Sequence, residues 1–287
     1  MHYSKPVTET IRQRFSCRTY LDQPIAEEQR RLLADFISSP RQGPCGASAR
    51  FELIAATEQG RNLLQRLGTY GFIKGAKGFI VGAIGRFDKN LEDYGYLMER
   101  AILFATDMGL GTCWLGGTFT KSSFAAAISA TGRELVPAVT SIGYIADQSR
   151  SRDSIRRRVG SDNRLPWERL FFDKRFDAPL SMEQAGAYTA PLEMVRLGPS
   201  ASNKQPWRIV KDGNAWHLYL QRTRGYGDAL TFGLLGLADL QRVDMGIAMC
   251  HFELTARELG LKGRWVTQEP GVEKPDRLTE YTASWLG

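Results

Sequence analysis

The chain is expected to form an α+β fold whose two related halves pack together as an internal pseudo-dimer. Two pairs of markers recur at nearly the same spacing. Gly109 and Gly260 each follow a long helical pattern and are 260 − 109 = 151 residues apart. Phe51 and Trp207 each end a loop of small residues and are 207 − 51 = 156 residues apart. Such a long period exceeds the repeats of solenoids and propellers, which favours a duplicated domain. Coincidence is the alternative, because many helices end at glycine.

The 287 residues are enough for one large core or two modest ones. We expect a first half at residues 1–150 and a second half at residues 181–287, joined by a crossover at residues 151–180. The crossover is rich in arginine but also contains Trp167 and Phe171. Because large aromatic side chains are usually buried, a packed connection is expected there instead of a flexible linker.

Apolar spacing predicts the elements of the first half. Val7 and Ile11 share one face of a short helix, which Ser4 can cap and for which Pro6 suits the first turn. The other elements of this half have helical or strand-like apolar patterns. They are helices over residues 24–38, 96–110 and 122–131 and strands over residues 51–55, 79–84 and 136–145, and the pattern of the central helix can be extended to Trp114.

The second half contains one clear hairpin. Asp212 and Gly213 lie between two apolar runs, which is a strong signal for a tight turn between paired strands. The elements of this half are a helix over residues 182–197, strands over residues 208–211 and 215–221, a second central helix over residues 240–259 with a pattern extending to Trp265, and a strand over residues 281–286.

Composition limits the class of protein. Hydrophobic content of 43% and charged content of 24% are ordinary for a globular protein, and a net charge of +7 favours anionic partners. No apolar run approaches the ~20 residues of a membrane span, and the N-terminus does not resemble a signal peptide, so no membrane partner is expected. The four cysteines are scattered without a Cys-x-x-Cys pair. We therefore expect no metal site and a cytoplasmic protein with reduced thiols.

The segment from Arg14 to Arg18 is suited to binding an anion. In an extended chain Arg14, Ser16 and Arg18 point to the same side. Two guanidinium groups and a hydroxyl on one side can grip a phosphate through charge-assisted hydrogen bonds. The alternative is an ordinary basic loop on a basic protein.

A loop of small residues is suited to covering a planar ligand. Pro199 stiffens its start, and Ser200, Ala201 and Ser202 allow a flat molecule to approach the backbone. Asn203 and Gln205 offer donors and acceptors that match the edge of a heterocycle. The alternative is a polar turn closed by a buried tryptophan.

Gly116 and Gly117 are a third candidate, because they leave backbone N–H groups unshielded after the central helix. Such groups can donate to a ring nitrogen or a carbonyl. The alternative is the usual structural use of glycine at the end of a helix.

Together these motifs resemble the flavin-dependent nitroreductase superfamily, specifically its branch with two nitroreductase-like halves fused in one chain. The resemblance covers most of the chain and implies a nitroreductase-like fold with flavin mononucleotide (FMN) bound between the halves. It implies that the phosphate is bound by Arg14, Ser16 and Arg18, with help from basic residues among Arg156, Arg157 and Arg158. It also implies contacts to the flavin ring from Gly116, Gly117, Pro199, Ser200, Ala201, Ser202 and Asn203.

One FMN per chain is expected, because the mirror-image site lacks its motifs. Ser48 stands roughly where a second Asn203 would, and residues 177–180 carry no basic pair. Two departures from the family pattern concern the ring. Residues 68–75 lack the Asn that many members place there, and Gly116 stands where some members have an acidic residue.

The leading hypothesis is an FMN-dependent oxidoreductase in which NADH or NADPH reduces the flavin and a nitroaromatic, quinone or similar flat acceptor reoxidises it. The flavin carries such chemistry, so no catalytic side chain is required. The alternative is a flavin-binding carrier or sensor without efficient turnover. Nucleic acid is an unfavoured partner, because no binding motif accompanies the basic charge. Fusion of the halves makes a monomer plausible, with a weak homodimer as the other possibility.

Overall fold

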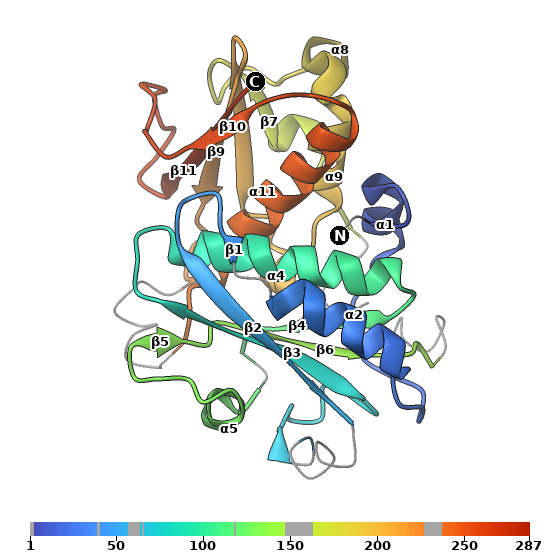
Figure 1. The fold of residues 1–287 in the computed structure, drawn as a ribbon. Helices are drawn as coiled ribbons and strands as arrows, with labels where there is room; N and C mark the ends of the chain where they lie inside the picture. Colours follow the sequence, from blue (N-terminus) through green and yellow to red (C-terminus); the bar gives the residue numbers. More distant parts are fainter. Residues whose placement is uncertain are drawn as a thin grey trace.

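The computed structural model describes residues 3–38, 41–56, 64, 66–117, 119–146, 163–226 and 237–287. Two long helices, α4 (Asn90–Asp107) and α11 (Leu240–Glu258), pack against each other between two sheets (Figure 1). Most residues of α4 are buried, because this helix contacts both the first sheet and α11. The arrangement confirms the predicted α+β fold of two packed halves.

The first sheet has the order β1–β2–β3–β6–β4, with β5 beside β3, and its strand pairs are antiparallel. Its strands are β1 (Arg41–Gln42), β2 (Ser48–Ala55), β3 (Gly78–Gly85), β4 (Gly111–Leu115), β5 (Glu134–Leu135) and β6 (Val139–Gly143). Among the residues described in this half, the helices beside α4 include α1 (Val7–Gln13), α2 (Glu27–Ser38) and α5 (Lys121–Ala127). Only the last residue of β3 is exposed, as its continuous apolar sequence predicts.

The second sheet has the order β10–β11–β9–β8–β7. Its strands are β7 (Phe171–Asp173), β8 (Trp207–Asp212), β9 (Ala215–Gln221), β10 (Arg264–Val266) and β11 (Thr279–Leu286), and its further helices are α8 (Met182–Ala185) and α9 (Thr189–Leu197). Strands β8 and β9 form the predicted hairpin. Strand β7 comes from the crossover and pairs in parallel with β8, with Leu170 and Phe171 buried. The crossover therefore packs where the structure describes it, whereas the three domain boundaries remain predictions.

Both central helices end in the same way. Gly109 and Gly260 have φ angles of 80° and 74°, the left-handed conformation that glycine adopts most easily. The next backbone N–H then returns to an alanine carbonyl in each copy: Leu110 to Ala105 at 3.0 Å and Leu261 to Ala256 at 2.9 Å. This hydrogen bond runs from the residue after the glycine back to the last turn of the helix, as in a Schellman motif. A matching cap at both markers favours duplication over coincidence.

The two helices cross at a second equivalent pair of glycines, Gly95 and Gly246, which are 246 − 95 = 151 residues apart. A Cβ atom on Gly95 would lie 2.1 Å from the carbonyl oxygen of Val243, and one on Gly246 would lie 1.9 Å from that of Glu92. Only glycine allows the backbones to approach this closely. The duplication thus explains why glycine interrupts both apolar helices at the same point.

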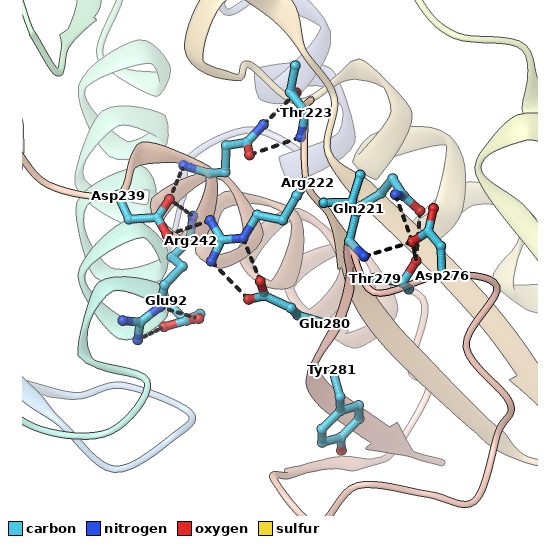
Figure 2. Close-up of polar contacts among 12 residues, drawn as sticks. Glu92, Gln221, Arg222, Thr223, Asp239, Arg242, Asp276, Thr279, Glu280 and Tyr281 are labelled. Carbon is cyan, nitrogen blue, oxygen red and sulfur yellow. Dashed lines mark hydrogen bonds and ion pairs between the residues drawn. The ribbon is translucent and has the colours of Figure 1, made fainter. Parts of the chain in front are cut away.

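One ion pair crosses the joint beside these glycines, and a second group of charged residues lies next to it in the second half. Figure 2 shows the side chain of Arg242, on α11, against Glu92 on α4, with a nitrogen–oxygen distance of 2.7 Å. It also shows Arg222 between Asp239, at the start of α11, and Glu280 of β11. Because Glu92 is almost fully buried, its pairing with Arg242 avoids an uncompensated charge at the joint.

Several element predictions are wrong in detail. Ser4 does not cap α1, because its N–H and hydroxyl bond to the carboxylate of Asp107. The central helices do not extend to Trp114 and Trp265, which lie in strands β4 and β10, because the left-handed glycines turn the chain. The helix expected over residues 182–197 is divided into α8 and α9 at Gly186, which has a φ of 57°.

Candidate functional site

A cavity of about 390 Å³ opens at the joint between the halves. Its size falls in the range of about 300–1,000 Å³ that is usual for small-molecule sites. Its lining contains all the described residues that the family resemblance implies for the site: Arg14, Ser16, Arg18, Gly116, Gly117, Pro199, Ser200, Ala201, Ser202 and Asn203. Arg156, Arg157 and Arg158 lie outside the described residues.

The arginine segment lies extended beside β4. Ser16 forms a parallel bridge with Thr112, and the N–H of Cys17 donates to the carbonyl of Thr112 at 2.8 Å. Because side chains alternate along an extended chain, Cys17 is fully buried while its neighbours on either side face the cavity. Nη1 of Arg18 is buried without a hydrogen-bond partner among the described residues. Such an atom is costly unless something binds it, so this end of the cavity fits an anion.

The loop of small residues has an unusual backbone. Ser202, Asn203 and Gln205 have φ angles of 49°, 54° and 49°, so three side-chain-bearing residues adopt the left-handed conformation. Each such residue stores about 1 kcal/mol or more of strain, and strain of this kind gathers at functional sites. The N–H of Gln205 donates to Oγ of Ser200 at 2.8 Å. Gln205 is buried and supports the loop from behind, so it does not contact the cavity as the sequence suggested.

Asp244, on α11, holds this loop and lines the cavity. Both of its carboxylate oxygens accept the N–H of Ala201, at 3.0 and 3.1 Å. Burial raises the pKa of Asp244 well above its ordinary value, although the Ala201 N–H opposes the shift. The sequence analysis missed this residue, whose only signal was an acidic side chain on the part of the helix that is mostly apolar, between Val243 and Met249.

Arg164 is a second residue that sequence reasoning missed. Its Nη1 donates to Oδ1 of Asn203 at 3.3 Å, and its Nη2 donates to the carbonyl of Leu197 at 3.1 Å. The Nδ2 group of Asn203 donates to the carbonyl of Asn163 at 3.0 Å. Arg164 therefore fixes the orientation of the Asn203 amide. It also brings a guanidinium from the crossover to the cavity.

The two glycines follow strand β4, and not the central helix as the sequence suggested. A Cβ atom on Gly116 would lie 2.3 Å from Cδ1 of Leu240, so a side chain there would require Leu240 of α11 to move. A Cβ atom on Gly117 would meet nothing within 4 Å. Gly116 thus brings β4 close to the second half, while Gly117 leaves backbone open at the cavity wall.

The arrangement suits an anionic molecule with a flat part. Three guanidinium groups line the cavity, and the pKa of its one acid, Asp244, is raised by burial. The described residues contain no cluster of side chains that could hold a metal ion. None of the described helices is long and apolar enough to cross a membrane.

Several solved structures are similar to the whole of this chain or to half of it. The chain is similar to a putative nitroreductase from Thermotoga maritima, with a TM-score of 0.62, 21% identity and coverage of 100% of this chain and 95% of that one. It is also similar over half its length to a putative nitroreductase in complex with FMN from Desulfovibrio desulfuricans, with a TM-score of 0.40, 25% identity and coverage of 50% and 88%. An FMN-dependent nitroreductase from Clostridium difficile has a TM-score of 0.39, 21% identity and coverage of 48% and 87%.

No curated protein matches the chain. A sequence model of the family described as "Putative TM nitroreductase" matches residues 6–256, which is most of the chain. The full-length structural match and the cavity between two halves agree with this result. The chain therefore belongs to the putative TM nitroreductase family.

Proposed function

We propose that the chain binds one FMN in the cavity between its halves and acts as an FMN-dependent oxidoreductase of nitroreductase type. The single observation that carries this proposal is the meeting of two motifs from different halves. Arg14, Ser16 and Arg18 from the first half face the 199–203 loop of the second half across one cavity. Neither motif alone could bind both the phosphate and the ring of a flavin nucleotide.

The residues of the chain fit the cofactor. The buried Nη1 of Arg18, which lacks a partner among the described residues, provides a donor for the phosphate. Ser16 and Arg14 would bind the same group, and the loop from Pro199 to Asn203 would lie against the ring. The open backbone at Gly117 would face the ring edge. The basic residues among Arg156–Arg158 are proposed to assist at the phosphate.

Bound FMN supplies hydride transfer, so the protein has to bind, orient and exclude water. The 199–203 loop is held from behind by Gln205 and from α11 by Asp244, which gives the cavity a preformed wall. Arg164 holds the amide of Asn203 in one orientation. We further propose that NADH or NADPH is the reductant and that a nitroaromatic, a quinone or a similar flat molecule is the acceptor. The internal pseudo-dimer is proposed to work as a monomer or a weak homodimer in the cytoplasm.

A second candidate function is flavin binding without efficient turnover. The amide of Asn203 favours it, because both ends of this amide are already engaged by Arg164 and Asn163. Residues 68–75 also lack the Asn expected from the family pattern. A carrier or sensor would need to retain the flavin but not to transfer hydride quickly.

The visible absorption spectrum of the purified protein tests the proposal. We expect a flavin spectrum, with FMN released by heat at close to one molecule per chain. Colourless protein that takes up no added FMN would contradict both candidate functions. If FMN is bound, steady-state consumption of NADH and NADPH with a nitroaromatic or quinone acceptor then separates the enzyme from the carrier.

A further inference from the structure

A buried chain of polar side chains lies behind the cavity and links the two halves. Glu99 on α4 and His251 on α11 are both fully buried. Nε2 of His251 lies 2.9 Å from Oε1 of Glu99. The Nε1–H group of Trp114, which lines the cavity, donates to Oε2 of Glu99 at 2.7 Å. Nε of Arg14 lies 3.9 Å from Oε1 of Glu99, so the chain reaches the proposed phosphate site.

The other nitrogen of His251 fixes the protonation of this chain. Nδ1 lies 2.8 Å from the carbonyl oxygen of Met194, in the last turn of α9. A carbonyl only accepts hydrogen bonds, so Nδ1 must carry a proton. The last carbonyls of a helix have no N–H partner within the helix, and this bond satisfies one of them.

A second proton must then lie between His251 and Glu99. With Nδ1 protonated, a hydrogen bond at 2.9 Å needs either an N–H on Nε2 or an O–H on Oε1. In the first case the pair is imidazolium and carboxylate, and in the second it is imidazole and carboxylic acid. Both cases give a pair with no net charge. The indole N–H of Trp114 is not this proton, because it donates to the other oxygen of Glu99, Oε2.

We propose that this shared proton cancels the charge of Glu99 and thereby keeps a bare carboxylate away from Arg14, which lines the cavity where the phosphate of the ligand is proposed to bind. A bare carboxylate 3.9 Å from Arg14 would compete with an incoming anion, because charges interact strongly where water is excluded. His251 and Glu99 are thus positioning residues that set the electrostatics of the site without contacting the ligand. The proposal rests on the proposed function, in which Arg14 binds the FMN phosphate.

His251→Gln tests the electrostatic role, because glutamine can still donate an N–H to Glu99 but carries no proton to cancel its charge. FMN and riboflavin, which share one ring system and differ by the phosphate, are titrated against the apoprotein by flavin fluorescence. We expect the affinity for FMN to fall by about 10- to 100-fold, the size expected for one charged hydrogen-bonding contact, while riboflavin changes by less than about 3-fold. The double variant E99Q/H251Q should restore FMN binding, because it removes the uncompensated carboxylate.

A matched control is His217→Gln. His217 is also buried, but its Nδ1 contacts Oγ of Ser284 in the second sheet, away from the cavity lining. This variant should bind both flavins as the wild type does. Thermal unfolding of all variants shows whether a loss of binding reflects a loss of folding.

The proton itself is tested at pH 8 by NMR of protein labelled with ¹⁵N at histidine. The chain has three histidines, so the signals missing from His251→Gln identify this residue. We expect a proton on Nδ1 and a second proton in the bond to Glu99. An unprotonated Nδ1, or no proton between the two side chains, would overturn the proposal.

The binding outcomes separate the possible failures. Equal FMN affinity in His251→Gln and the wild type, or equal losses of FMN and riboflavin, would overturn the role of the pair while leaving the proposed function intact. The role of the pair would also be overturned if Glu99→Gln alone lowered the affinity for FMN as strongly as His251→Gln. The carboxylate of Glu99 would then serve to position Arg14. If the wild type binds neither flavin, the proposed function fails together with this role, and the NMR result decides only whether the proton is shared.

Discussion

Each copy of the small-residue loop is held by an aspartate of the central helix, and the two aspartates accept different sets of hydrogen bonds. Asp93 and Asp244 occupy equivalent helix positions, 244 − 93 = 151 residues apart. Asp93 accepts the N–H groups of Cys45 and Ala47, at 2.8 and 2.7 Å. Among the described residues Asp244 accepts only the N–H of Ala201. Cys45 and Ala201 are 201 − 45 = 156 residues apart, the same interval as between Phe51 and Trp207.

The two loops also differ in how many of their residues adopt the left-handed backbone conformation. The first loop has one left-handed residue, Gly46, which adopts this conformation without strain. The second loop has Ser202, Asn203 and Gln205 in left-handed conformations, at a cost in strain. Only the second loop lines the cavity with the arginine segment. The copy that faces the proposed ligand therefore keeps strained residues that carry side chains. The other copy is unstrained, and two of its N–H groups bond to Asp93.

The largest expected effect concerns the crossing of the two central helices at equivalent glycines. Gly95→Ala and Gly246→Ala should each destabilise the protein by about 3 kcal/mol or more, because a Cβ atom would overlap a backbone carbonyl of the facing helix. Urea unfolding of each variant measures the loss. Gly132→Ala is the matched control, since its Cβ atom would meet nothing within 4 Å. A normal stability in either variant would mean that the two helices do not cross in the equivalent way described.

The next effect tests where the halves differ most, in the arginine segment. Arg18→Ala should weaken FMN binding by about 10- to 100-fold, because it removes a charge-assisted hydrogen bond worth about 1.5–3 kcal/mol. Riboflavin binding should change little. Fluorescence titration with both flavins measures this, and exposed Arg31→Ala serves as the control. Unchanged FMN affinity would refute the phosphate site.

The pH dependence of stability tests the two aspartates. Burial raises the pKa of Asp93 from 3.8 to about 6, against the N–H groups that lower it. The folded state then binds this proton more tightly than the unfolded state. Stability is therefore greatest below about pH 4 and falls as pH rises to about 6, by up to about 3 kcal/mol from this group. Unfolding of Asp93→Asn across this range should show a flatter pH dependence than the wild type.

The same measurement on Asp244→Asn should also give a flatter pH dependence than the wild type. Burial raises the pKa of Asp244 as well, so its contribution to stability also falls as pH rises. A profile as steep as that of the wild type would show that the folded state does not bind a proton at Asp244 more tightly than the unfolded state.

The sequence predicted the duplication and ten cavity residues, because both depend on local patterns that are visible in the linear sequence. Glycines at a fixed interval and alternation along Arg14–Arg18 are such patterns. Asp244 and Arg164 were missed because their roles depend on tertiary contacts: one lies within a helix and meets the loop only in space, and the other reaches Asn203 from the crossover. The helix ends at Trp114 and Trp265 were wrong because a left-handed glycine can stop a helix whose apolar pattern continues.

The smallest expected effect concerns the strained loop itself. Asn203→Ala removes the amide from the cavity wall and places alanine in a left-handed conformation that asparagine tolerates better. We expect FMN and riboflavin to lose affinity equally, by about 3- to 10-fold, because this loop is proposed to contact the ring they share. Asn203→Gly, which also lacks the amide but relieves the backbone, separates the two causes in the same titrations. A loss confined to FMN would instead place the effect at the phosphate, through Arg164, and would mean that the second loop does not serve the ring.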